Sequence, residues 1–310
     1  MPIEFFQQKN KAEWDEFVLS SKNGTFLFLR DYMDYHSDRF LDYSMVVRKG
    51  GKIVALIPAN IENDIVHSHK GLTYGGIVTS FAMTTTGFVT LFTEILDFLS
   101  RQGISKIIYK TVPAIYHKIP AEEDRYALFR ANAKLTRRDI LSVIHADHRV
   151  PEQKRRKRGA SRAHKSGLEI QESHNWIDFW TVLEGRLKTS HQVTPVHSLD
   201  EIVRLKDLFP NNIRLFVASL SDDILAGCVI FHTGIVAHAQ YIAASPEGQT
   251  KSALDLLFFR LINEEFRDTQ YFDFGISNEE NGRILNNGLV EFKEGFGARA
   301  IIHDHYELEL

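Results

Sequence analysis

Two charged segments of the sequence stand where they could do chemistry. Phe272-Asp273-Phe274-Gly275 places a carboxylate at the end of a predicted buried strand, where ligand sites of α/β proteins tend to lie. A carboxylate in such a place can act as a general base. The run Lys154-Arg155-Arg156-Lys157-Arg158, continued by Arg162 and Lys165, concentrates positive charge. If this run is helical, it offers enough cations for several contacts with nucleic-acid phosphates.

The fourteen histidines raise the question of a metal site. His67 and His69 would share one face of a strand, and so would His303 and His305, because alternate residues of a strand point the same way. No third ligand stands at a spacing typical of zinc sites. The sequence therefore predicts no metal cofactor. Cys228 stands in an apolar strand and is expected to be a small buried hydrophobe.

The bulk composition is that of an ordinary globular protein. The chain has 310 residues, 44% of them hydrophobic, a net charge of -3 and one cysteine. No apolar stretch is long enough to predict a membrane-spanning segment. A single cysteine excludes a disulfide framework, and the first residues lack a secretory signal pattern. We therefore expect a cytoplasmic protein.

The elements that position these residues follow the same order twice. The first half is predicted to contain helices at 11–20 and 30–36, a hairpin at 43–61, a strand at 65–69, a helix at 84–102, and strands at 104–109 and 138–144. The second half is predicted to contain helices at 175–187 and 199–209, a hairpin at 213–231, a strand at 235–243, a helix at 252–266 and a strand at 271–274. Corresponding elements are offset by roughly 165 to 170 positions, which indicates a duplicated domain-sized unit.

Four stretches of sequence, in this order, carry a resemblance to a known family. They are Trp14 to Val18 with Asn23 to Phe26, Leu72 to Val78, Arg162 to Leu168, and Phe272 to Gly275 with Phe292 to Gly297. Together they resemble the GNAT acyltransferases of the FemAB group. The resemblance implies an α/β fold of two tandem GNAT-like domains, each a mostly antiparallel mixed sheet flanked by helices. We expect an N-terminal domain at 1–148, a basic connector helix at 149–168, and a C-terminal domain with the active site at 169–310.

The resemblance also implies an activity, that of an N-acyltransferase. Such an enzyme moves an activated acyl group from acyl-CoA or aminoacyl-tRNA to the amine of a small molecule or peptide, and relatives act in cell-envelope biosynthesis. Lys293, beside Phe292, is the implied catalytic residue, because its ammonium could stabilise the oxyanion. The general base is expected to be Asp273, Glu291 or a nearby histidine.

The resemblance places the donor's phosphates at one loop and the substrates around it. The implied cofactor-binding residues are Ser245, Gln249, Thr250, Lys251 and Ser252. Gln249 agrees with the GNAT pattern, whereas Ser252 stands where that pattern has glycine. The alternative is an ordinary loop whose hydroxyl groups cap the helix that follows. The expected substrate-binding residues are Phe292, Tyr74, Tyr241, His191 and His197.

Two other functions fit the same residues. One is a non-catalytic binding module, derived from a GNAT transferase, whose altered loop no longer holds a donor. The other is RNA binding, including contact with a tRNA, through Arg155, Arg156 and Arg158 of the basic connector. Against it, no aromatic residues for base stacking are interleaved with these cations, and a solvated connector explains the charge run equally well.

Overall fold

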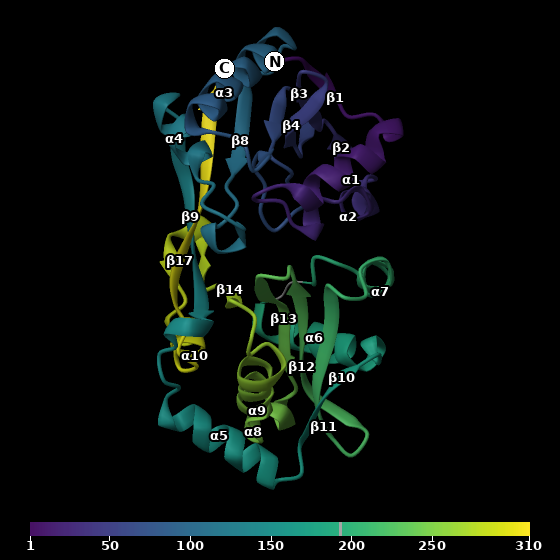
Figure 1. The fold of residues 1–310 in the computed structure, drawn as a ribbon. Helices are drawn as coiled ribbons and strands as arrows, with labels where there is room; N and C mark the ends of the chain where they lie inside the picture. The colour runs from purple at the N-terminus through teal and green to yellow at the C-terminus, as the bar shows by residue number, and fades with distance from the viewer. Residues whose placement is uncertain (192–193) are drawn as a thin grey trace. The chain divides into compact units, whose positions relative to one another are not determined.

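A computed structural model describes residues 1–191 and 194–310, without the side chains of residues 190 and 191. The chain forms two compact units (Figure 1). Unit 1 comprises Met1–Asp139, Glu280–Arg283 and Ile302–Leu310, and unit 2 comprises Ile140–Glu279 and Ile284–Ile301. No helix within the described ranges is both long and apolar enough to cross a membrane.

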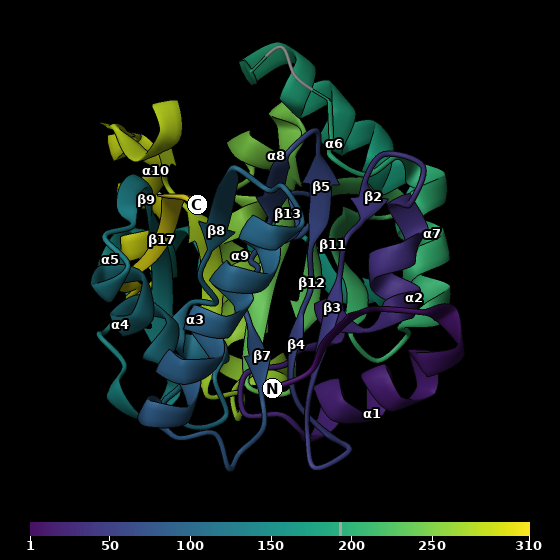
Figure 2. The ribbon, with the colours of Figure 1, turned by 90° about the horizontal axis from the view of Figure 1, so that it is seen from above.

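Unit 1 contains two sheets, with strand orders β1-β3-β4-β7 and β17-β8-β6-β5-β2. Its elements are β1 (Ile3–Phe5), α1 (Lys11–Ser20), α2 (Arg30–Met33), β2 (Leu41–Asp42), β3 (Met45–Lys49), β4 (Lys52–Ile57), β5 (Asn60–Glu62), β6 (Ile65–His67), β7 (Val78–Thr79), α3 (Thr85–Arg101), β8 (Lys106–Lys110) and α4 (Glu123–Arg130). The apolar stripe of α3 packs on the strands to form the core of the unit, and Figure 2 shows α3 lying near β8.

Unit 2 is built on the strand order β10-β11-β12-β13-β14-β9. Its elements are α5 (Lys154–Lys165), β10 (Glu169–Ser173), α6 (Trp176–His191), α7 (Leu199–Leu208), β11 (Ile213–Leu220), β12 (Asp223–His232), β13 (Val236–Ala244), α8 (Pro246–Thr250), α9 (Ala253–Arg260), a π-helix (Leu261–Glu265), β14 (Tyr271–Ile276), β15 (Asn278–Glu279), β16 (Ile284–Leu285) and α10 (Asn287–Glu294). Helices α6 and α9 cover opposite faces of this sheet (Figure 1).

Among the described strands each unit has one parallel pair, and a helical segment connects the two strands of that pair. In unit 1 the parallel strands are β6 and β8, joined by the segment that contains α3. In unit 2 they are β13 and β14, joined by the segment that contains α8 and α9. The other strand pairs described in both units are antiparallel. The predicted α/β class with mostly antiparallel mixed sheets is confirmed.

Two long strands contribute residues to both units, namely β9 (Lys134–His145) and β17 (Arg299–Glu309). The strand order runs through eleven strands, from β10 to β2. The units divide the chain at other residues than the predicted boundaries of 1–148 and 169–310, which stay predictions. Residues Ile302–Leu310 belong to unit 1 because β17 pairs with β8, from His305 opposite Lys110 to Glu309 opposite Lys106.

The predicted hairpin at 43–61 is interrupted by Pro58. Strand β4 ends at Ile57 and β5 begins at Asn60, in the other sheet of unit 1. Proline lacks the N–H that a strand ladder needs, so it stands between the two strands. The strand predicted at 65–69 consequently extends β5 instead of the hairpin. Asn10 precedes α1, but its side chain makes no capping hydrogen bond.

Helix α5 belongs to unit 2, where it packs closely on α9. A Cβ added at Gly159 would lie 1.9 Å from Oδ2 and 3.1 Å from Cβ of Asp255, so only glycine allows this approach. Asp255 is held in place because its Oδ1 accepts a hydrogen bond of 2.7 Å from Arg156 Nη1. The segment predicted as a connector, residues 149–168, therefore contributes a packed helix.

Two Gly→Ala changes should have opposite effects on stability. Gly159→Ala should lower the free energy of unfolding by about 1–3 kcal/mol, because the new methyl group displaces Asp255. Gly185→Ala, in α6, meets no atom within 4 Å and should raise it by about 0.5–1 kcal/mol through helix propensity. Urea denaturation measures the change in the free energy of unfolding of each variant. Equal changes in the two variants would contradict the close contact between Gly159 and Asp255.

Candidate active site

The parallel pairing of β13 and β14 ends after three residue pairs. It runs from Val236 opposite Tyr271 to His238 opposite Asp273, although both strands continue. On its other side β14 pairs with β9 from Tyr271 onward, with a register shift between Asp273 and Ile276. Strands β13 and β14 thus separate at their carboxyl ends, where ligand sites of α/β proteins tend to lie.

A histidine and an aspartate meet at the last parallel pair. His238 Nδ1 lies 2.9 Å from Asp273 Oδ2, and Asp273 Oδ1 accepts a hydrogen bond of 2.7 Å from the backbone N–H of Gly275. Asp273 is fully buried and His238 is 9% exposed. If Nδ1 carries the proton, the carboxylate fixes this tautomer and Nε2 is left as a proton acceptor, which is the arrangement a general base needs.

Gly275 gives the end of β14 its shape. Its φ of +72° lies in the left-handed region, which favours glycine. An added Cβ would stand 3.3 Å from Cε1 of His238. The absence of a side chain therefore lets the backbone turn beside the imidazole.

Lys293, on α10, is buried beneath this turn. Its Nζ donates hydrogen bonds to the backbone oxygens of Gly275, at 3.0 Å, and Ile276, at 2.5 Å. Burial lowers the pKa of Lys293 to about 8, and the nearby Asp273 carboxylate opposes that shift. An ammonium has three donors, so one remains beyond these two bonds. The catalytic role predicted for Lys293 stays a prediction.

Strand β13 contains a β-bulge just after His238. Val229 of β12 pairs with Tyr241 and Ile230 pairs with Ala239, so Gln240 is the extra residue. The Oε1 atom of Gln240 is buried and has no hydrogen-bond partner among the described residues. An unsatisfied buried acceptor costs about 1–3 kcal/mol, so this oxygen favours a ligand that donates a hydrogen bond.

Tyr241 and His197 form a buried pair. The Tyr241 hydroxyl lies 2.5 Å from His197 Nδ1 and accepts a hydrogen bond of 3.1 Å from the His197 backbone N–H. Burial raises the pKa of Tyr241 to about 12. The Tyr241 ring also packs edge-on against Trp180 of α6. The structure thus brings together two of the predicted substrate-binding residues.

The other predicted substrate-binding residues lie elsewhere. Tyr74 belongs to unit 1, where its hydroxyl lies 2.9 Å from Thr25 Oγ1 and its ring packs against Phe28 and Tyr116. Phe292 packs against Phe258 and Phe296. The side chain of His191 lies outside the described residues.

The predicted donor loop folds into the short helix α8 and the start of α9. Its five residues make mainly local contacts. Ser245 Oγ accepts from Gly248 N, Gln249 Nε2 donates to Ala244 O, Thr250 Oγ1 donates to Pro246 O, and Lys251 pairs with Glu247. Ser252 has a φ of +60° and makes no capping hydrogen bond, so it is not the predicted cap of α9. Its Oγ accepts a hydrogen bond of 2.5 Å from Arg162 Nη2 instead.

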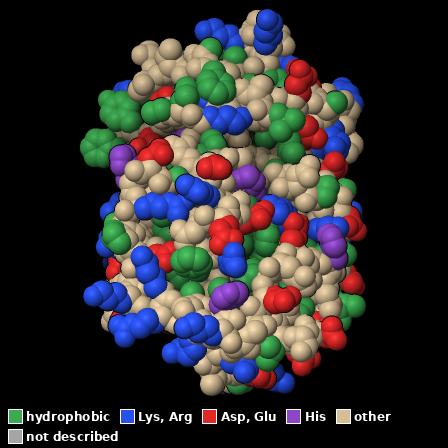
Figure 3. All heavy atoms as spheres, turned by 60° about the horizontal axis from the view of Figure 1, so that its bottom comes forward, with side chains coloured by type: hydrophobic (Ala, Val, Ile, Leu, Met, Phe, Trp, Pro, Cys, Tyr) green, Lys and Arg blue, Asp and Glu red, His purple; other side chains and the backbone are tan. Residues whose placement is uncertain are grey.

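The cations of α5 fall into two groups. Arg156 pairs with Asp255 and lies 4.5 Å from the centre of the Phe292 ring, and Arg155 pairs with Glu291. Arg158 and Arg162 are exposed. Figure 3, in which the end of the molecule that carries α5 comes forward, shows many Lys and Arg side chains on that face. Of the predicted nucleic-acid contacts, Arg155 and Arg156 are engaged within the protein.

The sequence contained weak signals for two residues that the structure adds to this site. His238 is a polar residue within the otherwise apolar start of β13, and Arg162 closes the basic run. Cys228 is buried in β12 as predicted, and burial raises the pKa of its thiol well above the ordinary value.

A protein-family model describes the same part of the chain. The model of the acetyltransferase (GNAT) domain matches residues 148–293, just under half of the chain. These residues are similar to a GNAT acetyltransferase domain. The match covers β13, β14 and Lys293, and it confirms the predicted class of enzyme, an N-acyltransferase. A search of curated proteins found no match for this chain.

Solved structures confirm the tandem, FemAB-like GNAT fold over the whole chain. FemX aligns with a TM-score of 0.70 and 11% identity, covering 98% of this chain and 97% of its own. The lysylphosphatidylglycerol synthetase from Bacillus licheniformis, L-PGS, aligns with a TM-score of 0.62 and 12% identity, covering 97% and 91%. A tandem GNAT protein from the clavulanic acid pathway aligns with a TM-score of 0.52 and 10% identity, covering 99% and 98%.

The buried ammonium of Lys293 predicts a pH dependence of stability. Because Lys293 binds a proton less readily when folded, the folded state should gain stability as the pH rises from about 8 toward the ordinary lysine pKa of 10.5. Lys293→Met should flatten this rise, and the exposed Lys188→Met should leave it unchanged. Urea denaturation across this pH range measures the slopes, and equal slopes in all three proteins would contradict the burial of a titrating ammonium.

Proposed function

We propose that unit 2 transfers an activated acyl or aminoacyl group to an amine at the point where β13 and β14 separate. The observation that carries this proposal is the His238–Asp273 pair at the last residue pair of the parallel ladder. The GNAT domain match supports acyl transfer in general. The donor, the acceptor and the roles of individual residues belong to the proposal.

In the proposed reaction the amine nitrogen attacks the carbonyl carbon of the donor. His238 Nε2 takes the proton that the amine loses, and Asp273 stabilises the imidazolium. A C–N bond forms, and the C–S bond of a thioester or the C–O bond of an ester breaks. The leaving thiolate or alkoxide takes up a proton, which the imidazolium can return.

Three groups are proposed to stabilise the other charges of this reaction. The backbone amide at the Gln240 bulge lies outside the regular ladder and is proposed as a donor to the oxyanion. The unpaired Oε1 of Gln240 is proposed to accept a hydrogen bond from the incoming amine. Lys293 keeps the carbonyls of Gly275 and Ile276 in place, and its third donor is the proposed contact with the reacting carbonyl.

The donor's phosphates are proposed to lie at the first turn of α9. This helix starts at Ala253, its free N–H groups favour an anion, and Arg162 and Lys251 add positive charge. Phosphates of acyl-CoA and of aminoacyl-tRNA share this chemistry. The exposed cations of α5, including Arg158, extend the positive surface, so that it can contact several phosphates of a polynucleotide.

Acceptors from the cell envelope form part of the proposal. FemX and a lysylphosphatidylglycerol synthetase share the fold of this chain, and the name of the second describes an amino acid joined to a lipid. The amine of a small molecule or of a peptide is therefore the first class of acceptor to test.

Replacing His238 tests the proposed base. His238→Gln should lower kcat/KM by about 100-fold or more, since general-base catalysis typically contributes 10²–10⁴-fold. The exposed His174→Gln should keep full activity and serves as the matched control. Transfer of radiolabelled acetyl or aminoacyl groups to a panel of amines provides the assay. Unchanged turnover in a folded His238→Gln protein would refute the role of the imidazole.

The donor can be identified by measuring binding separately from catalysis. Acyl-CoA and aminoacyl-tRNA are each added, and the midpoint of thermal unfolding is measured, because a ligand of the folded state raises it. Arg162→Ala should weaken binding of either donor, whereas Arg158→Ala should weaken tRNA alone and reduce its salt dependence. If neither donor raises the midpoint of thermal unfolding, the proposal of a donor site at α9 is wrong.

A further inference from the structure

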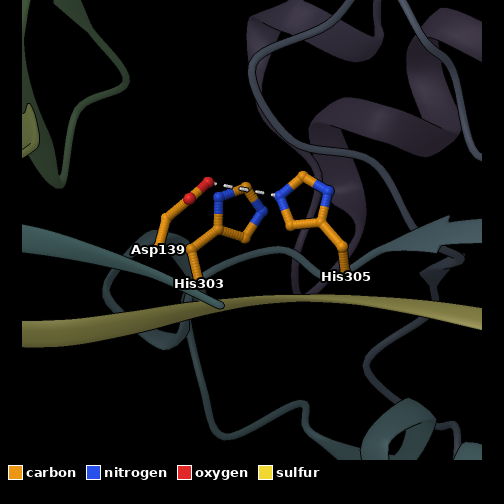
Figure 4. Close-up of side chains that lie close together, drawn as sticks. All are labelled: Asp139, His303 and His305. Carbon is orange, nitrogen blue, oxygen red and sulfur yellow. Dashed lines mark ion pairs between the residues drawn. The ribbon is translucent and has the colours of Figure 1, made fainter. Parts of the chain in front are cut away.

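A second group of polar side chains lies in unit 1. Asp139 on β9 and His303 and His305 on β17 each direct one ligand atom toward a common point, and these three atoms lie within 4.8 Å of one another (Figure 4). Asp139 and His303 are almost fully buried, and the His305 side chain is 14% exposed. All three residues belong to unit 1, outside the segment that the GNAT domain model matches.

The contact between His305 and Asp139 is not a hydrogen bond. His305 Nε2 lies 3.4 Å from Asp139 Oδ2, yet this buried nitrogen has no hydrogen-bond partner in the described part of the chain. Two ligands bound to one tetrahedral ion at about 2.0–2.1 Å are separated by roughly 3.4 Å. The pair thus already has the spacing of neighbouring metal ligands, and the nitrogen's lone pair is available if its other nitrogen carries the proton.

His303 is oriented by the backbone. Its Nε2 lies 2.9 Å from the backbone oxygen of Thr111, which can only accept, so Nε2 carries the proton and Nδ1 has the lone pair. Histidines that bind metals characteristically donate their second N–H to a carbonyl or carboxylate in this way. One ring nitrogen of His303 lies within 4.8 Å of the ligand atoms of Asp139 and His305, whereas ligands of one tetrahedral ion lie roughly 3.4 Å apart, so the imidazole moves toward them when an ion binds.

Asp139 is fixed by Arg137 of the same strand. Arg137 Nε lies 2.9 Å from both carboxylate oxygens. A carboxylate offers about four lone-pair sites, so an oxygen that accepts from Arg137 can also bind a cation. Hydrogen bonding to a ligating carboxylate is the usual outer support of a metal site.

The charges around the group favour a tightly bound transition metal over a hard cation. Besides Arg137, the facing strand β8 contributes Lys110, directly opposite His305, and its Nζ donates to the backbone oxygens of Lys70 and Leu72. Two cationic neighbours repel every divalent cation, and one carboxylate supplies too little oxygen charge to offset this for Mg²⁺ or Ca²⁺. Two imidazoles and one carboxylate are the ligand set that Zn²⁺ prefers.

We propose that Asp139, His303 and His305 bind one Zn²⁺ ion in unit 1. Three protein ligands leave a fourth tetrahedral position for water or another small ligand. The ion cross-links β9 and β17, and so fastens the strand Arg299–Glu309 to its neighbour. The sequence alone predicts no metal here, because Asp139 lies far along the chain from the two histidines.

Metal binding by the full chain tests this proposal without any assay of transfer. The purified protein is stripped with a chelator, dialysed against ZnCl₂ or MgCl₂, and analysed for bound metal. We expect one Zn²⁺ per chain, no Mg²⁺, and a rise in the thermal unfolding midpoint with Zn²⁺. Co²⁺ in place of Zn²⁺ should give the strong visible absorption of a tetrahedral site, a measurement that needs no variant.

Variants then locate the ion. Asp139→Asn and His305→Gln should lose stoichiometric Zn²⁺ binding, and Arg137→Ala should weaken it by about 10- to 100-fold. The exposed His174→Gln should bind as the unmodified protein does. Circular dichroism checks that each variant is folded. The proposal is overturned if the stripped protein takes up no Zn²⁺, or if folded Asp139→Asn and His305→Gln proteins retain it.

Discussion

The site of unit 2 depends on the early end of the parallel ladder between β13 and β14. Three residue pairs hold the strands together, and then the bulge at Gln240 and the left-handed turn at Gly275 lead them apart. Strands that stayed paired would satisfy their backbone groups with each other and leave none for a ligand. The same separation places His238 and Asp273 at the narrow end, where Asp273 is fully buried and His238 keeps slight exposure.

Burial explains why this arrangement holds its shape. Asp273 accepts from both the imidazole and the Gly275 amide, while Lys293 binds the carbonyls of Gly275 and Ile276 from below. Each charged group thus finds partners inside the protein, which is the condition for a charge to remain buried. Hydrogen bonds therefore hold both the amide group and the carbonyl groups of the turn beside His238.

Local patterns were sufficient to predict most elements, and pairing over long distances was not. The apolar stripe of α3 repeats every few residues within one helix, so periodicity reveals it. The pairing of β17 with β8 joins strands at opposite ends of the chain, and no local pattern encodes it. The prediction of the site shows the same difference. Asp273 lies in a strand that the sequence pattern reveals, whereas His238 is recognised only because it lies opposite Asp273.

The position of β17 has a consequence for biosynthesis. Its partner β8 is synthesised before any strand of unit 2, whereas residues Ile302–Leu310 are synthesised after all of them. At about 5–20 residues per second, the nascent first unit waits many seconds with an unpaired strand edge. An exposed edge of this kind invites wrong pairing, so a chaperone is most useful to this chain during that interval.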